Sequence, residues 1–483
     1  MSLNNILSRI GEFGPFQIRV YLLLNALSVL RCCQMFLLVF IADKPQWNCL
    51  LDDLILDGNK KFPCLNNGSV CSNVQFSGEF TSIASEWRLI CDKEYKRSLA
   101  NALVMTGCLV GAVLFGGMAD KRGRKSSIVL LHSVASVSCI ASGLAQTYEL
   151  FVLFRFITAV VLSGCSTAVF VLVSEIVGQS SKDMLLTAYQ ASYSFGYVLL
   201  SLFAYFIRDW RHLTITVSAP IVFCSMFLLQ TGLCESPHWL VENGRIDECK
   251  QLLREIAKTN GADISEAMLE KLPNELPNKV DTKQYSKSRS ILTQPGYLKK
   301  VVTFSIIWLS LGMMYLGLSF VSGSLSSNKY LSFALCGVVE IPALSLSVWV
   351  IKSGRRIPLC TLALITSFAC LACASLQNGE QSQVGVYITA TALLGKFGVA
   401  ACYNIIYIFS AENFGASVRS FTLGLFSVVS SLGGILAPLV IGLDAYDKRI
   451  PMVSFGIGAI IAAGFVMTLP ETAKANKRDK KTN

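Results

Sequence analysis

Twelve stretches of about 20 mostly apolar residues occur along this chain of 483 residues, and they restrict the possible folds more than any other feature. An α-helix of about 20 apolar residues is long enough to cross the hydrocarbon core of a bilayer. A membrane barrel would instead show strands of about ten residues with alternating polarity, which these stretches lack. We therefore expect an all-α membrane protein with twelve transmembrane helices. The predicted spans are residues 18–42, 98–118, 127–146, 150–173, 184–207, 213–233, 300–322, 329–350, 357–376, 384–409, 419–443 and 451–469.

The composition agrees with this class, and the position of the charges predicts the orientation. Only 15% of the residues are charged, against about 25% in soluble proteins. The net charge of +11 comes largely from basic clusters at 121–125, 352–356 and 474–481, which twelve spans would place on one side of the membrane. Because basic loops remain in the cytoplasm, we expect both termini to be cytoplasmic. The basic excess is therefore no indication of a nucleic-acid partner.

Two predicted loops are much longer than a simple connection. The loop at 43–97 lies outside the cell by this topology and contains the glycosylation sequon that starts at Asn67. It also holds four cysteines, which in an oxidising compartment can form two disulfides with three possible pairings. These cysteines are Cys49, Cys64, Cys71 and Cys91. The other long loop, 235–299, is cytoplasmic, and its residues 245–253 have the pattern of an amphipathic surface helix.

These loops divide the chain into two bundles of six helices each. We expect an N-terminal bundle at 1–234, which includes the extracellular loop, a cytoplasmic linker at 235–299, and a C-terminal bundle with a basic tail at 300–483. Nothing in the sequence predicts an enzyme, a metal site or a cofactor. Cys370 and Cys373 form a CxxC motif without a second pair, so packing in an apolar span is the better interpretation.

Short charged motifs recur at matching positions in the two halves. The segment 117–125 after the second span corresponds to 351–356 after the eighth, and Glu175 after the fourth span corresponds to Glu412 after the tenth. Such repetition is typical of secondary transporters, whose halves rock about a central site. Opposite charges at these span ends would stabilise the state that is closed toward the cytoplasm. The predicted gating residues are Asp120, Arg124, Glu175, Arg355, Arg356, Glu412 and Arg419.

Motifs along nearly the whole chain resemble one known family. They lie at 86–92, 116–125, 208–211, 235–240, 340–342 and 470–472. Together they resemble the organic ion transporters of solute carrier family 22, in the major facilitator superfamily. The resemblance implies a plasma-membrane transporter of small organic ions. Two motifs depart from the family: His238 replaces the usual arginine, and residues 412–416 differ from the family's motif after the tenth span.

Three ionisable residues in mid-span predict where the site lies. Arg31, Glu340 and Lys396 would each cost roughly 2.5–3.5 kcal/mol at the centre of the bilayer if they faced lipid. They must therefore face the interior, where a pair between Glu340 and Lys396 would offset part of the cost. Either a structural ion pair or contact with a substrate or coupling ion explains them. Arg155, near the outer start of the fourth span, is interpreted as structural or interfacial.

Aromatic residues supply the second part of an organic-ion site, because ring faces bind amines at about 0.5–2 kcal/mol each. Trp308 and Tyr315 share a helix face, and the resemblance implies that they lie in the cavity. Ser431 occupies the position where related cation carriers have aspartate and anion carriers arginine, while residues 395–398 resemble carnitine-type carriers. We therefore expect a zwitterion or an amine as substrate; an organic anion, or a non-transporting receptor on the same fold, is the alternative. The predicted substrate-binding residues are Arg31, Trp308, Tyr315, Glu340, Lys396, Tyr403 and Ser431.

Overall fold

A computed structural model describes most of the chain. The described residues are 3–43, 46–51, 54–57, 74–77, 80–178, 181–231, 233–270, 295–322, 328–377, 382–414 and 416–472. In the first half the long helices are α2 (Pro15–Phe36), α5 (Tyr95–Gly116), α7 (Arg124–Leu144), α8 (Tyr148–Ile176), α9 (Lys182–Phe206) and α10 (Trp210–Thr231). In the second half they are α15 (Pro295–Val321), α16 (Lys329–Val350), α17 (Arg356–Leu376), α18 (Ser382–Asn413), α19 (Ala416–Ile441) and α20 (Ile450–Met467).

These long helices coincide with the twelve predicted spans, and several extend beyond them by a few residues. Eleven are long and apolar enough to cross a membrane by length and composition. The twelfth, α9, is more polar, because its first half contains Tyr189, Gln190, Ser192 and Ser194. Proline in the first turn helps to start α2 and α20, since its fixed φ suits the first helical position and its missing N–H is not needed there.

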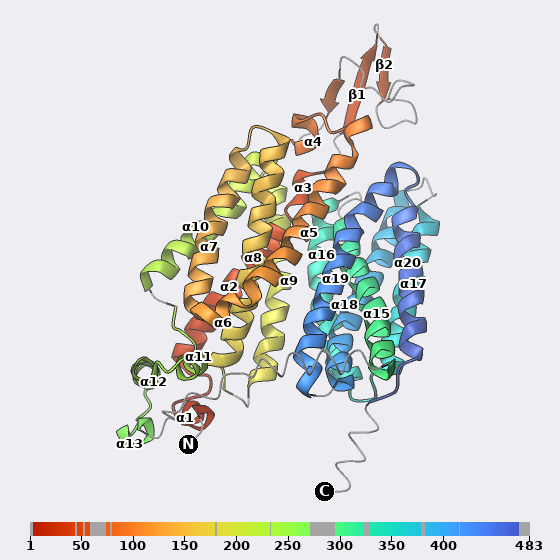
Figure 1. The fold of residues 1–483 in the computed structure, drawn as a ribbon. Coiled ribbons are helices and arrows are strands. Elements are labelled where there is room, and N and C mark those ends of the chain that lie inside the picture. Colours follow the sequence, from red (N-terminus) through yellow and green to blue (C-terminus); the bar gives the residue numbers. More distant parts are fainter. Residues whose placement is uncertain are drawn as a thin grey trace.

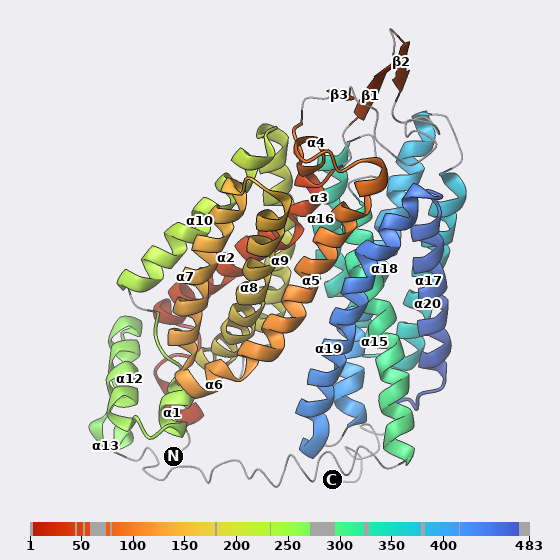
Figure 2. The same ribbon diagram turned by 45° about the horizontal axis from the view of Figure 1, so that its top comes forward.

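The long helices form two groups, which Figures 1 and 2 show side by side. In the first group α2 packs on α8, α9 and α10, while α8 also packs on α5 and α7. In the second group α15 packs on α18, α19 and α20, while α18 also packs on α16 and α17. The groups meet through α9 with α16 and through α5 with α19. The interface between the halves is therefore made by equivalent helices, the second and fifth long helix of each group.

Short elements lie at the two ends of these groups. The helical ones are α1 (Leu3–Arg9), α3 (Leu38–Ile41), α4 (Ile83–Glu86), η1 (Cys91–Lys93), α6 (Met118–Arg122), α11 (Pro237–Glu242), α12 (Ile246–Asn260), α13 (Glu266–Leu269) and η2 (Gly442–Ala445). Figure 1 shows α3 and α4 at one end together with a small sheet, and α1, α12 and α13 at the opposite end. We call these the sheet end and the α12 end.

The long loop after the first span contains strands that the sequence did not predict. The strands β1 (Gln46–Leu51), β2 (Leu54–Asp57) and β3 (Val74–Ser77) form an antiparallel sheet in the order β2-β1-β3. Cys49 lies in β1, where its backbone is opposite Leu56 and Val74. Cys91 is disulfide-bonded. Cys64, Cys71 and the sequon at Asn67 lie outside the described residues, so the pairing and the glycan stay predictions.

The second long loop contains an amphipathic helix, as its pattern indicates. The apolar face of α12, with Leu253 and Ile256 at its centre, packs with α1 and α11 in one buried cluster. At the end of α12, the Asn260 Oδ1 accepts a hydrogen bond of 3.1 Å from the backbone N–H of Phe16. Asn260 thereby satisfies a free N–H at the start of α2. The loop is thus attached to the first half of the molecule.

Candidate functional site

A buried ion pair lies where the two halves meet. The Lys396 Nζ on α18 is 2.6 Å from the Glu340 Oε1 on α16, with side-chain exposures of 0% and 5%. The structure therefore pairs the two opposite charges that the sequence placed in mid-span. Each charge compensates the other in a region where an isolated charge is costly.

Hydroxyl groups surround this pair, and two of them belong to the other half. Ser194 on α9 donates to the Glu340 Oε2 at 2.7 Å. Lys396 donates to the Ser319 Oγ at 2.8 Å, and that oxygen lies 3.2 Å from the Tyr197 hydroxyl of α9. Gly337 allows this approach of α9 to α16, because a Cβ there would lie 2.5 Å from the Ser194 carbonyl oxygen. The ion pair is therefore part of the contact between the halves.

Aromatic rings continue from the ion pair into the second half. The Lys396 Nζ lies 3.5 Å from the centroid of the Tyr315 ring, within cation–π distance. The Tyr315 and Tyr403 ring centroids are 5.2 Å apart, and the Tyr403 and Trp308 centroids 5.3 Å apart. Trp308 is only 1% exposed and donates from Nε1 to the Ser410 Oγ at 3.0 Å. In this conformation Trp308 is fully buried, whereas Tyr315 and Tyr403 are partly exposed.

Ser431 lies beside this ring cluster but makes a different contact from its neighbour. Its Oγ donates to the Ser427 carbonyl at 2.9 Å within α19. The adjacent Ser430 is the residue that meets the rings, since its Oγ is 2.7 Å from the Tyr403 hydroxyl. Direct binding of substrate by Ser431 stays a prediction.

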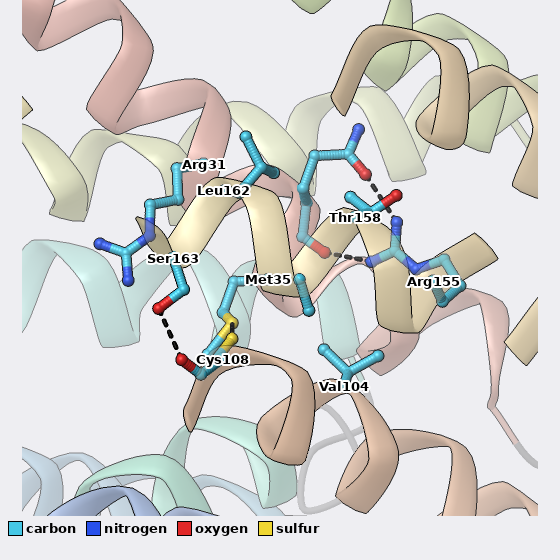
Figure 3. A pocket seen from close by; sticks show the side chains of 10 residues that line it. Arg31, Met35, Val104, Cys108, Arg155, Thr158, Leu162 and Ser163 are labelled. Atoms are coloured by element: carbon cyan, nitrogen blue, oxygen red, sulfur yellow. Dashed lines mark hydrogen bonds between the residues drawn. The ribbon is translucent and has the colours of Figure 1, made fainter. Parts of the chain in front are cut away.

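Two arginines line a small hollow between α2, α5 and α8 in the first half. Arg155 is 2% exposed, and its guanidinium donates twice to Gln34, once to the side-chain oxygen at 2.6 Å and once to the backbone carbonyl. Arg31 lies at the other end of the hollow, 5.9 Å from the Tyr193 ring centroid. Figure 3 shows the two guanidiniums at opposite ends, with Met35, Cys108 and Val104 between them. Arg155 is thus held in place by α2, as its structural interpretation implies.

A charge cluster is present at the α12 end of the first half. The Arg124 guanidinium forms two hydrogen bonds of 3.0 Å with the Glu175 carboxylate and lies 3.2 Å from an Asp120 oxygen. Glu235 accepts from the backbone N–H groups of Arg124 and Lys125 at 2.8 and 3.2 Å. This carboxylate therefore caps the amino end of α7, where a negative charge is favourable.

The second half repeats this arrangement almost group for group. Arg355 contacts the Glu412 carboxylate at 2.8 and 3.2 Å. Glu471 accepts from the backbone N–H groups of Arg355 and Arg356 at 3.0 Å each, and so caps the amino end of α17. The repeated motifs in the sequence thus correspond to a repeated structure.

Three further residues of these clusters have distinct positions. Arg356 donates to the backbone carbonyl of Met467, and Arg419 is exposed in the first turn of α19. At His238, on α11, burial lowers the pKa below its usual range. The imidazole is therefore neutral near pH 7, so this departure from the family motif removes a positive charge.

The halves also contact each other at the sheet end. The Lys329 Nζ lies 2.6 Å from the Asp43 Oδ2, and the Phe40 and Tyr330 rings stack with centroids 5.6 Å apart. At the α12 end, by contrast, the ion pairs of the two charge clusters each lie within one half among the described residues. Asp120 is 70% exposed there. The halves are therefore fastened together at the sheet end.

Several of these residues have no counterpart in the sequence prediction. Ser194, Ser319 and Ser430 are common residues, and only the packing of neighbouring helices shows what they face. Glu235 and Glu471 could have been predicted from the sequence, because each directly follows the last span of its half and the two therefore occupy matching positions. Over the described residues, no group of three or more His, Cys, Asp or Glu side chains is placed to hold a metal ion.

Comparison with known proteins gives consistent matches. The family model of the Major Facilitator Superfamily matches residues 97–438. The chain is 31% identical to "Solute carrier family 22 member 15-like" of Xenopus tropicalis over 98% of this chain and 94% of that protein. It is 29% identical to "Organic cation/carnitine transporter 2" of Homo sapiens, over 96% and 90%. Among solved structures it resembles the partially occluded inward open conformation of the xylose transporter XylE from E. coli, with a TM-score of 0.67, 15% identity, and coverage of 94% and 98%.

Proposed function

This chain belongs to the major facilitator superfamily and, within it, to solute carrier family 22; it is a membrane transporter of organic ions and not an enzyme, and we propose that it carries small organic zwitterions or amines by alternating access. The predicted twelve-helix fold in two six-helix bundles is confirmed. The similarity to the human organic cation/carnitine transporter 2 supports this substrate class.

One observation carries the proposal: a buried ion pair lies at the contact between two structurally repeated halves, and the partly exposed rings of Tyr315 and Tyr403 adjoin it. Because alternating access moves two such halves about a central site, Glu340, Lys396, Tyr315 and Tyr403 are in the position of a substrate site. Their rings suit an ammonium group. The fastened sheet end then corresponds to a conformation that is closed on that side.

The orientation and the moving parts belong to the same proposal. The sheet end faces outward and the α12 end faces the cytoplasm, in keeping with the basic clusters near Lys121 and Arg355. The bundles 1–234 and 300–483 move relative to each other, joined by the linker 235–299. The protein lies in the plasma membrane with a glycan on Asn67.

Uptake by reconstituted protein tests the function directly. Purified protein in liposomes is offered radiolabelled carnitine, tetraethylammonium and hippurate, which represent a zwitterion, a cation and an anion. We expect saturable uptake of the first or second above protein-free liposomes; uptake of hippurate alone would make the organic anion the substrate class. Gradients of Na⁺ or H⁺ in the same assay identify a coupling ion. Absence of uptake for the whole panel, with folded protein in the liposomes, would favour a non-transporting receptor.

The charge cluster of the first half gives a prediction about gating. We expect Glu175→Gln and Asp120→Asn to reach the cell surface but to slow turnover about tenfold, because each removes a contact that joins the halves in the state closed toward the cytoplasm, and the loss of about 1–3 kcal/mol from that state shifts a two-state balance appreciably. Both variants should favour the inward-open state and increase thiol labelling of single cysteines placed at the α12 end. Glu255→Gln, on the exposed face of α12, is the matched control. Normal turnover together with unchanged labelling in both variants would refute the gating role.

A further inference from the structure

The membrane-spanning helices of this protein carry more positive than negative charge in their middle parts. Arg31, Arg155 and Lys396 are cations well inside long helices, whereas Glu340 is the one such anion among the described residues. Since Glu340 is paired with Lys396 at 2.6 Å and accepts from Ser194, it leaves two guanidiniums without a compensating negative charge. Uncompensated charge in the low-dielectric interior attracts an anionic group.

The two guanidiniums differ in what they can still bind. Arg155 is buried and already donates twice to Gln34, which fixes its orientation. Arg31 is partly exposed, and within the described part of the chain its guanidinium contacts the Tyr193 ring, whose centroid is 5.9 Å away. A guanidinium carries five N–H donors in a fork that matches a carboxylate. Arg31 therefore has the free donors for a bidentate contact.

The surroundings of Arg31 connect it with the proposed substrate site. Figure 3 shows its guanidinium pointing away from the end of the hollow that Arg155 and Gln34 fill. The Tyr193 and Tyr197 ring centroids are 6.3 Å apart, and the Lys396 Nζ lies 5.5 Å from the Tyr197 centroid. Aromatic rings thus lead from Arg31 in the first half to the ion pair and Tyr315 in the second.

We propose that Arg31 binds the carboxylate of the transported ion, so that this transporter selects substrates that bear a carboxylate over simple organic cations. The inference rests on the proposed function and assigns the anionic end of the substrate to the first half. The apolar or ammonium part of the substrate then lies along the rings toward Tyr315 and Tyr403. A zwitterion and a carboxylate anion share this chemistry, and the test separates them.

A matched pair of probes measures this preference. In proteoliposomes, 4-trimethylammoniobutyrate and butyltrimethylammonium differ by the carboxylate, and hippurate represents a carboxylate without the ammonium group. We expect wild-type protein to take up the first probe with an apparent affinity at least about tenfold higher than the second. Uptake of 4-trimethylammoniobutyrate in preference to hippurate would identify a zwitterion carrier, and the reverse an anion carrier; either supports a carboxylate contact.

Substitutions then assign the contact to Arg31. Arg31→Gln should bring the ratio of the two affinities close to one, mainly by weakening uptake of 4-trimethylammoniobutyrate. Arg31→Lys should retain part of the preference for this probe. Arg19→Gln changes an exposed arginine on the same helix and should leave the ratio unchanged. If Arg31→Gln does not fold, the ratio of the two affinities is compared between wild type and Arg31→Lys, and a lower ratio in Arg31→Lys assigns the contact to Arg31. A wild-type ratio near one, or an unchanged ratio in a folded Arg31→Gln protein, would overturn this proposal while leaving transport intact. Absence of uptake for all three probes would overturn it together with the proposed function.

Discussion

Glu340→Gln is expected to lower uptake by about 100-fold, because it leaves the Lys396 ammonium buried without its carboxylate, and breaking a buried pair costs about 3–5 kcal/mol. The Glu340 carboxylate lies 2.6 Å from that ammonium and also joins α16 to Ser194 of α9. The substitution therefore affects both the charge of the site and the contact between the halves. Transport and surface expression are measured together, so that loss of activity is separated from loss of folded protein.

A double variant distinguishes the two roles of the pair. Glu340→Gln with Lys396→Met removes both charges, so that neither is left buried alone. If the pair is only structural, the double variant should recover surface expression and transport; if it also binds substrate, expression should recover while uptake stays low. Glu149→Gln removes a mostly exposed carboxylate on α8 and serves as the control. Uptake with unchanged affinity in both Glu340→Gln and Lys396→Ala would exclude a binding role for the pair.

The sequence predicted most of the architecture, because lipid imposes a requirement that can be recognised residue by residue. Each span must present about 20 apolar residues, and this requirement alone places the twelve long helices. Mid-span charge is equally conspicuous, which is why Glu340 and Lys396 were expected to face the interior. The repeated clusters around Arg124 and Arg355 also followed from matching sequence motifs.

The detailed contacts depend on which helix faces which, and helical periodicity does not show that. The spacing of Trp308 and Tyr315 predicts a shared helix face, and both rings contact Tyr403. The spacing does not show, however, that Trp308 is fully buried in this conformation. The partner of Tyr403 on α18 is Ser430 of α19 and not the neighbouring Ser431, a difference that depends on which face of α19 lies toward α18. The strands after the first span were missed because the polar loop that contains them lacks a clear alternation.

Alternating access requires the halves to separate at the sheet end during every transport cycle. A covalent bond between them at this end should therefore stop transport. Ser98 on α5 and Gly442 in η2 provide the position, since a Cβ at Gly442 would lie 3.1 Å from the Ser98 Cβ. Disulfides usually join Cβ atoms about 3.5–4.5 Å apart, so a small shift accommodates one.

Uptake by the Ser98→Cys/Gly442→Cys variant, before and after oxidation, is the most direct measurement. Mass spectrometry reports the cross-linked fraction, and the two single variants, oxidised in the same way, control for the native cysteines. We expect oxidation to abolish uptake in proportion to cross-linking, and a reductant to restore it. The cross-linked protein should still bind substrate from the α12 end. Undiminished uptake by fully cross-linked protein would contradict alternating access between these halves.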